Sequence, residues 1–492
     1  MDILPDKKKF IHLSASSSRV PVCGEESFPA LDPFLLFQEL FKNSKRSFLL
    51  ESGKGPTETA RFSIFGESNS KQLQFFRKKA ILYENDTLKF EFGEVKEAFK
   101  LLDFNKDTQC VDYIPHFWGG WVGFVGYEAG ALFENINLQT SSNNLPDISF
   151  MEVEELFIYD HNSHKLKFII SGDKKTKDSD YEEFFQKIKQ VWKEVQIALE
   201  KISSEKSLNA NYKKPFPATS IKSYLNKNDY MQKVDKAKAY ICDGDIYQAN
   251  LSQKFETPFD QDPLDLYQKL RRVNPSPFSG FLKFDKLVLV SSSPERLIKV
   301  SGDTIESRPI AGTRPRSKIA EEDKALAREL LLNNKERAEH LMLVDLERND
   351  LGRICKAGSV VVTEFMFLEK YSHVSHIVSN ISGSLLPNRS IFEILKATFP
   401  GGTITGCPKI RCMEIINELE PVERGPYSGS FGYIGYAPYM DLNIIIRSII
   451  INNGNASFHV GAGIVADSIP EKEYQETLDK AAAMVEALSA EY

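Results

Sequence analysis

Two stretches of the chain each carry a pair of glutamates three positions apart: Glu336 with Glu339, and Glu473 with Glu476. Residues three apart lie on the same face of a helix, so each helix would present two carboxylates together. Two such faces brought together would form an all-oxygen site suited to Mg²⁺, which keeps part of its water shell and bridges to an anionic ligand. Glu339 directly precedes the apolar run 340–344, and a carboxylate at the edge of a core needs a partner. The alternative interpretation is a solvated acidic face on each helix.

A glycine-rich loop is the second candidate for chemistry. Residues 400–409 contain three glycines and two prolines, which break both helix and strand. The helical pattern at 410–419 follows at once, so the loop would lead into a helix N-terminus whose free N–H groups attract anions. The loop is not a P-loop, because Cys407 and Pro408 stand before Lys409 and the Gly-Lys-Ser/Thr ending is missing. An ordinary tight connection is the alternative.

Further side chains suit an anionic ligand. His376 lies in an alternating strand pattern and would act as a general acid near neutral pH if it faced a cleft, although a strand histidine is more often structural. Arg447 follows three isoleucines, and a guanidinium there would bind a carboxylate through two hydrogen bonds. Tyr433 and Lys480 could add a hydroxyl and a second cation. Together with the glycine turn 461–463, these residues favour a pocket for a small ligand with several negative charges.

The composition limits the class of protein. The chain has 492 residues, of which 42% are hydrophobic and 26% charged, as in soluble globular proteins. Its net charge of −6 argues against a broad nucleic-acid-binding surface, so counter-charges for an anionic ligand must be local. No apolar stretch of about 18 residues and no signal-peptide pattern is present, which predicts no membrane segment. The six cysteines are scattered, as expected for reduced thiols in a cytoplasmic protein.

The elements that must position these residues favour an α+β fold. Strand patterns outnumber helix patterns, many neighbouring strands are hairpin-like, and β-α alternation is absent. We therefore predict large, mostly antiparallel β-sheets packed with helices. The predicted strands lie at 47–52, 71–76, 87–92, 148–159, 165–171, 246–255, 279–284, 286–291, 297–300, 359–368, 375–384 and 442–451, and the predicted helices at 34–41, 179–203, 227–242, 320–346, 410–419 and 471–488.

The chain also divides into two predicted units. The region 206–222 is polar and contains two prolines, a composition typical of a linker. We therefore predict one α+β unit at 1–205 and a second at 223–492. All the candidate residues named so far lie in the second unit.

Six stretches of the second unit resemble, in order, the chorismate-utilising enzymes, a family that includes anthranilate synthase component I, aminodeoxychorismate synthase component I, isochorismate synthase and salicylate synthase. These stretches are 243–248, 292–297, 308–316, 339–350, 401–409 and 461–480. Weaker matches occur at 49–52 and 119–123. The resemblance implies the chorismate-binding fold of that family, with 223–492 as the catalytic domain and 1–205 as a regulatory-type region.

The same resemblance implies roles for individual residues. Mg²⁺ would be held by Glu339 and Glu476, with Glu336 and Glu473 as outer support, and would bind the ring carboxylate of chorismate. His376 matches the residue that protonates the departing ring hydroxyl. The remaining substrate contacts, including those to the enolpyruvyl carboxylate, would come from Gly312, Thr313, Tyr433, Arg447, Gly461, Ala462, Gly463 and Lys480.

Two positions bear on the expected reaction. The water-using members of the family carry a lysine where this chain has Gln248, and a neutral amide cannot activate water, so the resemblance implies ammonia as the nucleophile. The chain lacks the Gly-x-Cys-x-Gly elbow of glutamine amidotransferases, so a separate amidotransferase subunit is the expected source of ammonia. Many aminodeoxychorismate synthases carry a nucleophilic lysine where this chain has Ala311. The alanine favours anthranilate synthase component I, which makes anthranilate and pyruvate in tryptophan biosynthesis.

Two alternatives stay open. Residues 250–252, 274–280 and 401–406 look more like the aminodeoxychorismate branch, which makes 4-amino-4-deoxychorismate for the folate and p-aminobenzoate pathway. A protein of another class, a non-catalytic subunit that binds a small regulatory molecule, is the second alternative. The presence of the glutamates, His376 and Arg447 argues against this second alternative.

The resemblance also implies an effector site for tryptophan. Residues 50–52 are similar to the tryptophan-sensing segment of anthranilate synthases, which makes Ser52 a candidate contact. Pro277, Phe278 and Ser279 match the other side of that site. Anthranilate synthases usually carry Tyr-Met where this chain has Phe278 and Ser279, so the effector site departs from the family pattern.

Overall fold

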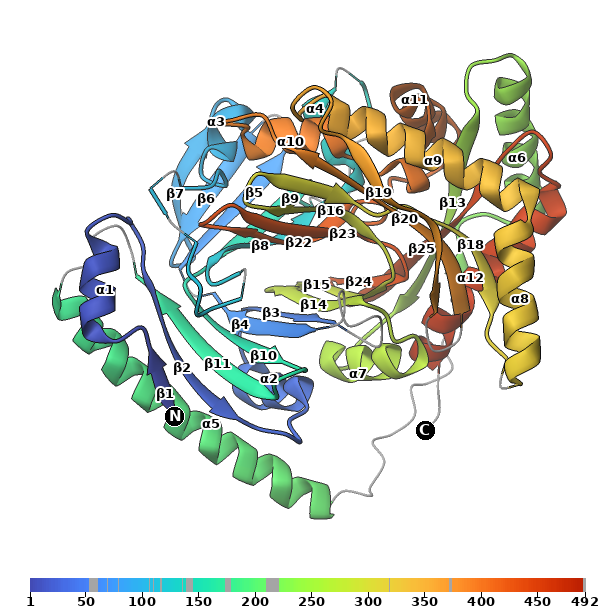
Figure 1. Cartoon of the computed structure of the whole chain (residues 1–492). Helices are drawn as coiled ribbons and strands as arrows, with labels where there is room; N and C mark the ends of the chain where they lie inside the picture. Colours follow the sequence, from blue (N-terminus) through green and yellow to red (C-terminus); the bar gives the residue numbers. More distant parts are fainter. Residues whose placement is uncertain are drawn as a thin grey trace.

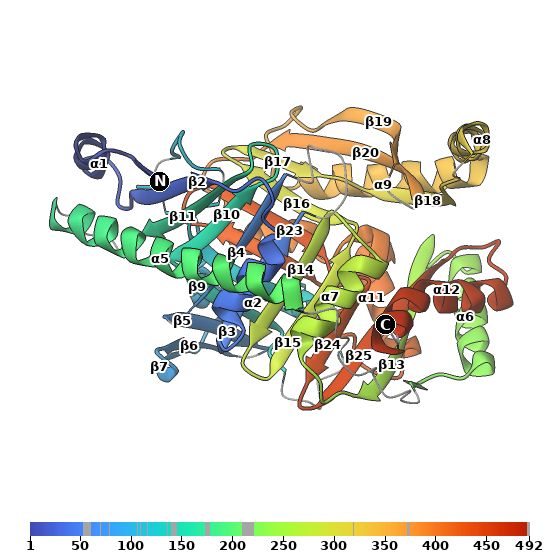
Figure 2. The same ribbon diagram turned by 90° about the horizontal axis from the view of Figure 1, so that it is seen from below.

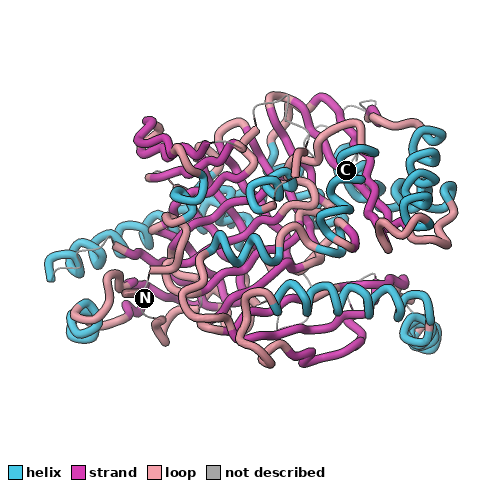
Figure 3. Tube along the Cα trace, turned by 90° about the horizontal axis from the view of Figure 1, so that it is seen from above, coloured by secondary structure: helices cyan, strands magenta, loops and turns pink. Residues whose placement is uncertain are grey.

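The computed structural model describes most of the chain and shows two large β-sheets with helices on their outer faces. The described residues are 1–52, 61–68, 70–77, 79–105, 107–108, 110–115, 117–134, 136–138, 145–172, 178–208, 221–317, 319–370 and 374–489. Figure 1 shows the two sheets as stacked layers, and Figure 3 shows strands in the interior with helices around them. Every strand pair in the two sheets of the described chain is antiparallel, which confirms the predicted α+β class with large antiparallel sheets.

The first sheet has 13 strands. Along the sheet they are β1 (Asp2–Leu4), β2 (Pro21–Ser27), β11 (Lys165–Ser171), β10 (Glu155–Asp160), β4 (Phe62–Glu67), β3 (Arg46–Glu51), β14 (Phe278–Phe284), β15 (Leu287–Ser293), β24 (Ser448–Asn452), β25 (Asn455–Ile464), β13 (Gln248–Pro258) and β12 (Lys222–Ser223), with β21 (Gly406–Cys407) beside β13. The second sheet has 12 strands. They are β18 (Ile310–Pro315), β20 (Val374–Ser384), β17 (Thr304–Ser307), β16 (Arg296–Ser301), β23 (Tyr439–Ile444), β22 (Ser430–Gly435), β8 (Gly120–Val125), β9 (Ile148–Val153), β5 (Lys71–Phe76), β6 (Lys79–Glu84) and β7 (Thr87–Phe92), with β19 (Val361–Lys370) beside β20.

Helices cover the outer faces of both sheets (Figure 2). Those of the first half are α1 (Lys7–Ser14), α2 (Pro33–Phe41), α3 (Val95–Phe99), α4 (Gly130–Phe133) and α5 (Asp178–Leu208). Those of the second half are α6 (Lys227–Cys242), α7 (Pro263–Val273), α8 (Ala320–Leu332), α9 (Asn334–Gly352), α10 (Ile391–Thr398), α11 (Lys409–Leu419) and α12 (Pro470–Ser489). The single helix predicted at 320–346 is two helices, because the Asn333 side chain accepts a hydrogen bond from the Glu336 backbone N–H and starts a new helix.

The chain passes from one sheet to the other at a few short points. The strand predicted at 148–159 is β9 in the second sheet and β10 in the first, divided at Glu154. The strand predicted at 442–451 is likewise β23 and β24, divided at 445–447, where Arg447 has a left-handed φ of 51°. A third crossing, between β15 and β16, lies at Pro294 and Glu295. Each crossing places its residues at the boundary between the two layers.

The two predicted units share both sheets. Strand β3 pairs with β14, where Leu49 faces Phe281, and β8 pairs with β22, where Gly123 faces Gly432. One hydrophobic core between the sheets contains buried side chains from both parts of the chain. A boundary at 206–222 therefore does not separate two sheets or two cores. Residues 209–220 of the predicted linker lie outside the described residues.

Gly123 tests the packing of neighbouring strands in the second sheet. A methyl group on Gly123 would overlap the Ser149 carbonyl oxygen and the Phe150 side chain on the neighbouring strand. We expect Gly123→Ala to lower the free energy of unfolding by about 2 kcal/mol or more, since neither neighbour can move without disturbing the sheet. The measurement is urea denaturation followed by tryptophan fluorescence.

The matched control is Gly93→Ala, because a methyl group at Gly93 meets nothing within 4 Å. Its free energy of unfolding should stay within about 0.5 kcal/mol of wild type. Equal midpoints for the two variants would contradict the packing described here.

Candidate active site

The predicted catalytic histidine is buried between two strands of the second sheet. His376 on β20 faces Thr313 on β18, and its Nδ1 lies 3.0 Å from Thr313 Oγ1 and 3.1 Å from the Gly312 carbonyl oxygen. A carbonyl only accepts hydrogen bonds, so Nδ1 carries the proton of the neutral ring. Burial, with a further contribution from Arg447, lowers the pKa of His376 to about 4 against the opposing hydrogen bond to Gly312. The imidazole is therefore neutral near pH 7 in the free protein.

A bulge in β18 brings an acidic helix close to this histidine. The pairing of β18 with β20 is irregular between Ala311 and Thr313, and Gly312 has a φ of 64°. A side chain on Gly312 would meet the Glu336 carboxylate, with its Cβ 2.9 Å from Oε2. The glycine thus allows both the left-handed backbone and the close approach of α9. Arg314 holds Glu336 from the other side at 3.2 Å.

The four predicted carboxylates lie on α9 and α12, which flank the same region. Burial raises the pKa of Glu339, and the charges of Glu336 and Glu476 raise it further against the attraction of Lys335. Burial, and the charge of Glu476, likewise raise the pKa of Glu473. The two helices therefore bring their carboxylates close enough to repel one another, as the sequence predicted.

These carboxylates fit a Mg²⁺ site in which the protein supplies only two ligands, and not a site in which it supplies all of them. Among the described residues, no group of three or more His, Cys, Asp or Glu side chains has metal-binding geometry. The side chains of Glu339 and Glu476 are 32% and 48% exposed, which leaves room for water and for a ligand. Two carboxylates plus water and an anionic ligand is a donor set that Mg²⁺ accepts. Mutual repulsion between the two carboxylates is what a bound cation would relieve.

Cations lie next to these acids. Lys480 on α12 forms an ion pair with Glu476 at 2.7 Å, and its Nζ donates to the Gly461 carbonyl oxygen at 2.9 Å. Arg447 lies near His376, since its charge lowers the pKa of that histidine. The predicted substrate residues Arg447, Lys480 and Gly461 thus belong to one cluster with His376.

Glu295 also belongs to this cluster, although the sequence analysis gave it no role. It lies at the β15–β16 crossing and is 6% exposed. Burial raises the pKa of Glu295 to about 7, against the opposing charges of Arg447 and Lys480. A glutamate directly after Ser-Ser-Pro, between two apolar strands, was the available sequence signal.

Residues 461–463, which the sequence predicted to form a glycine turn, are instead part of strand β25 and pair with β13. Their glycines make room for side chains from β13. A Cβ on Gly461 would lie 2.8 Å from the Tyr427 hydroxyl and would also overlap the Asn250 Oδ1. A Cβ on Gly463 would lie 2.8 Å from Gln248 Nε2. Gln248 is therefore beside Gly463, and Ala462 between the glycines is fully buried on the other face of β25.

The structure corrects the position of one predicted substrate residue. Tyr433 does not lie beside residues 461–463; its ring packs on Phe117 with centroids 4.4 Å apart and lines a different cavity. Tyr427, six residues earlier, is the tyrosine beside Gly461. The sequence did signal a loop there, because Arg424-Gly425-Pro426 precedes Tyr427, but it did not distinguish the two tyrosines.

That different cavity holds all the predicted effector residues. It has a volume of about 510 Å³, and Ser52, Pro277, Phe278 and Ser279 line it together with Tyr433. Its walls come from β3 and β14 of the first sheet and from β16, β22 and β23 of the second. Arg296 lies over the Phe278 ring at 4.9 Å and binds Asp441 through two hydrogen bonds of 2.8 and 2.9 Å. The cavity combines aromatic surface with charged groups.

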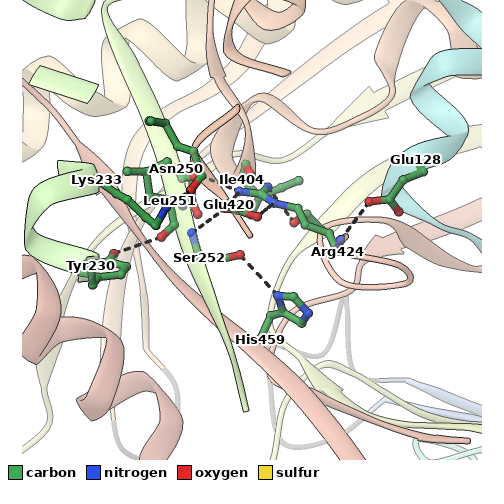
Figure 4. Close-up of polar contacts among 12 residues, drawn as sticks. Glu128, Tyr230, Lys233, Asn250, Leu251, Ser252, Ile404, Glu420, Arg424 and His459 are labelled. Atoms are coloured by element: carbon green, nitrogen blue, oxygen red, sulfur yellow. Dashed lines mark hydrogen bonds and ion pairs between the residues drawn. The ribbon is translucent and has the colours of Figure 1, made fainter. Parts of the chain in front are cut away.

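The buried Arg424 connects Asn250 of β13, Ile404 of the glycine-rich loop and Glu420 (Figure 4). Arg424 donates to both Glu420 carboxylate oxygens at 2.6 and 2.9 Å, to the Asn250 carbonyl at 2.6 Å and to the Ile404 carbonyl at 3.0 Å. The Glu128 carboxylate accepts from the Arg424 backbone N–H at 2.8 Å. The loop at 400–409 is thus fixed to β13 by polar contacts in the described structure.

Comparison with known proteins decides the family. A family model described as "chorismate binding enzyme" matches residues 45–486. The chain belongs to the chorismate-binding enzyme family. The Gly312–His376 and Gly461–Gly463 regions both lie inside the matched residues.

Relatives of two kinds resemble this member of the family along nearly its whole length. Anthranilate synthase component 1 of Acetivibrio thermocellus is 39% identical over 472 residues, which cover 95% of each protein. Aminodeoxychorismate synthase component 1 of Bacillus subtilis (strain 168) is 40% identical over 462 residues, which cover 93% of this chain and 95% of that protein. The crystal structure of anthranilate synthase component I from Streptococcus pneumoniae TIGR4 matches with a TM-score of 0.72 at 33% identity, covering 92% of this chain and 97% of that one. In the described part of the chain, no helix is long and apolar enough to cross a membrane.

The carboxylate pair predicts a measurable effect of Mg²⁺ in the absence of substrate. We expect millimolar MgCl₂ to raise the melting temperature of the wild-type chain and to leave that of Glu339→Gln unchanged, because the amide cannot neutralise a cation. Since the pKa of Glu339 is raised, the effect should fade as the pH drops and the carboxylate takes up a proton. The control is Glu321→Gln on α8, whose side chain is 85% exposed. A shift that survives in Glu339→Gln would place the ion elsewhere.

Glu295 predicts a pH dependence of stability. Its pKa of about 7 in the folded protein is above its ordinary value of 4.5, so its contribution to stability is present at low pH and is lost as the pH rises through 7. Between pH 5 and pH 8 we expect wild type to lose about 2 kcal/mol more than Glu295→Gln. Urea denaturation at the two pH values measures the difference. Parallel losses in both proteins would show that Glu295 ionises normally.

Proposed function

We propose that this chain is the chorismate-converting large component of an anthranilate synthase, which makes anthranilate and pyruvate from chorismate and ammonia. Membership of the chorismate-binding enzymes supports chorismate as the substrate. The relative from Acetivibrio thermocellus, named anthranilate synthase component 1, supports the reaction. The observation that carries the proposal is the neutral, buried side chain of Gln248 beside Gly463, where a water-activating enzyme needs a base.

The charges around the site suit a substrate with two carboxylates. Arg447, Lys480 and the backbone of 461–463 would bind the enolpyruvyl carboxylate, and Tyr427 would add its hydroxyl. Glu339 and Glu476 would hold Mg²⁺, with Glu336 and Glu473 behind them, and the ion would neutralise the ring carboxylate. Without that ion, the acids of α9 and α12 would repel the substrate.

His376 supplies the proton in this proposal. Ammonia attacks C2 of the ring, and the ring hydroxyl leaves as water with a proton from His376. Loss of the C2 proton and of the side chain as pyruvate then makes the ring aromatic. A bound dianion would favour the protonated imidazole and so oppose burial and Arg447, which hold its pKa near 4 in the free protein. His376 is therefore suited to take up its proton only when substrate is bound.

Ammonia would come from a separate glutamine amidotransferase subunit. The name "component 1" of the relatives fits an enzyme of more than one component. The chain itself carries no Gly-x-Cys-x-Gly elbow.

The cavity lined by Ser52 and Phe278 would bind an aromatic amino acid such as tryptophan as an effector. An amidotransferase partner together with a tryptophan-binding effector site fits a cytoplasmic enzyme of tryptophan biosynthesis.

The second candidate is aminodeoxychorismate synthase component 1. The relative from Bacillus subtilis with that name is 40% identical, as similar as the anthranilate synthases. Ala311 distinguishes the two proposals, since it lies next to Gly312 in β18 and cannot form a covalent adduct as a lysine would. A non-catalytic regulatory subunit is less well supported, because the acids, His376 and Arg447 are gathered in one place.

One assay separates the three. The purified chain is incubated with chorismate, MgCl₂ and an ammonium salt, and the products are followed by anthranilate fluorescence and by pyruvate release. We expect both, at equal rates. His376→Gln should lower kcat by a factor of about 100 or more, since the proton donor is lost. A product that keeps its side chain would identify the aminodeoxychorismate branch, and the absence of any chorismate turnover would support the regulatory subunit.

A further inference from the structure

A second, smaller cavity lies at the far end of the β13–β25 strand pair. Its volume is about 130 Å³. Lys254 and Glu256 of β13, Ser457 and His459 of β25, and Arg424 contribute to its wall. Asn453, in the turn between β24 and β25, and Asn455, the first residue of β25, also line it. Gly461 and Gly463 lie near the other end of β25.

One face of this strand pair is polar along its whole length. In the antiparallel register Ser457 faces Glu256, His459 faces Lys254, Gly461 faces Ser252, and Gly463 faces Asn250. Successive side chains of a strand alternate between faces, so these four pairs lie on one face. The side chains between them, Ala456, Phe458, Val460 and Ala462, are buried in hydrophobic cores. At about 3.3 Å a residue, the polar face runs roughly 20 Å from the cavity to the candidate active site.

Two stacked rings lie midway along this face. His459 and Tyr427 are parallel within 15°, with centroids 5.1 Å apart. His459 Nδ1 lies 3.4 Å from Ser252 Oγ (Figure 4), and the Tyr427 hydroxyl lies against Gly461. His459 therefore touches the cavity on one side, and its stacking partner touches the active site on the other.

The inner end of the face has acceptors without donors. Gln248 and Asn250 are 9% and 8% exposed. Among the described residues, neither Gln248 Oε1 nor Asn250 Oδ1 has a hydrogen-bond partner. A buried amide oxygen without a donor is unfavourable, so each points to a ligand that donates hydrogen bonds. Ammonia is such a ligand, with three N–H groups and little volume.

The charges along the face also suit ammonia. Glu256 and Glu423 line the cavity and attract the ammonium ion that predominates in neutral solution. Beyond the cavity, Ser252, Asn250 and Gln248 are buried and uncharged, so a cation would lose its hydration there without gaining a counter-charge. An ammonium ion would therefore give its proton to water at the mouth, and the neutral molecule would continue.

We propose that ammonia reaches the reacting carbon through this 130 Å³ cavity, along the polar face of β13 and β25 and past the His459–Tyr427 pair, to Gln248 and Asn250. This route rests on the proposed function, because only an ammonia-using enzyme needs it. It is separate from the region between α9 and α12, where the carboxylates would bind chorismate through Mg²⁺. Amination would thus have two entrances, one for each substrate.

The test blocks the mouth reversibly. Ser457 lines the cavity and takes no part in the candidate catalytic site. Ser457→Cys is labelled with benzyl methanethiosulfonate, and the rate of chorismate amination is measured against ammonium concentration before labelling, after labelling and after reduction. We expect the label to raise the KM for ammonium about tenfold, to leave the KM for chorismate unchanged, and to be reversed by reduction.

Two controls make the outcome decisive. Wild type treated in the same way accounts for labelling of the native cysteines, of which Cys110 and Cys242 are exposed. Ser457→Trp fills the mouth without a reagent and should show the same split between the two KM values. If labelled and unlabelled protein have the same KM for ammonium, ammonia enters elsewhere and the route is wrong. If no variant and no wild-type sample aminates chorismate, the proposed function itself fails, and the route with it.

Discussion

The short crossings between the two sheets are the constraint on which the site depends. A strand that leaves one layer and joins the other changes its backbone partners at the crossing: the Arg447 carbonyl accepts from the Ser292 N–H at 3.1 Å, and the Glu295 carbonyl accepts from the Ile444 N–H at 2.9 Å. The side chains at the crossing therefore lie where the two layers meet. Glu295 and Arg447 occupy two such crossings and lie close to each other although 152 residues separate them in the sequence. Arg447 also takes a left-handed φ, a conformation that persists in a non-glycine residue only where the surrounding structure requires it.

Charges of both signs meet around this point. Glu339 of α9 lies near Glu476 of α12, Lys480 is paired with Glu476 at 2.7 Å, and Arg447 lies near Glu295. In the proposed function, a substrate with two carboxylates would be oriented by this arrangement, one end toward a cation held by Glu339 and Glu476 and the other toward Arg447. The acidic protein binds an anion because local groups, and not its net charge, set the potential inside the cluster.

The sequence predicted the class of fold, most helices and strands, and the grouping of Glu339, Glu476, His376, Arg447 and Lys480. It did not predict the crossings, because the apolar run at 442–451 reads as one buried strand and only its partners, β22 and β15, reveal two. The predicted boundary at 206–222 does not divide the sheets for a related reason: the composition of a linker does not show which strands pair. Tyr427 was missed because a loop tyrosine beside Arg424 and a strand tyrosine six residues later carry equal signals until His459 and Gly461 are in place.

The 510 Å³ cavity has a mechanical consequence for the enzyme. Arg296 forms part of its wall and is bonded in the chain to Glu295, while Asp441 and Asn443 belong to the strand that ends just before Arg447. A molecule bound in this cavity would therefore press on the strands that lead to Glu295 and Arg447. Inhibition by an end product bound in this cavity would need no hinge and no subunit rotation. A displacement of a few tenths of an ångström, transmitted along β16 and β23, would be enough.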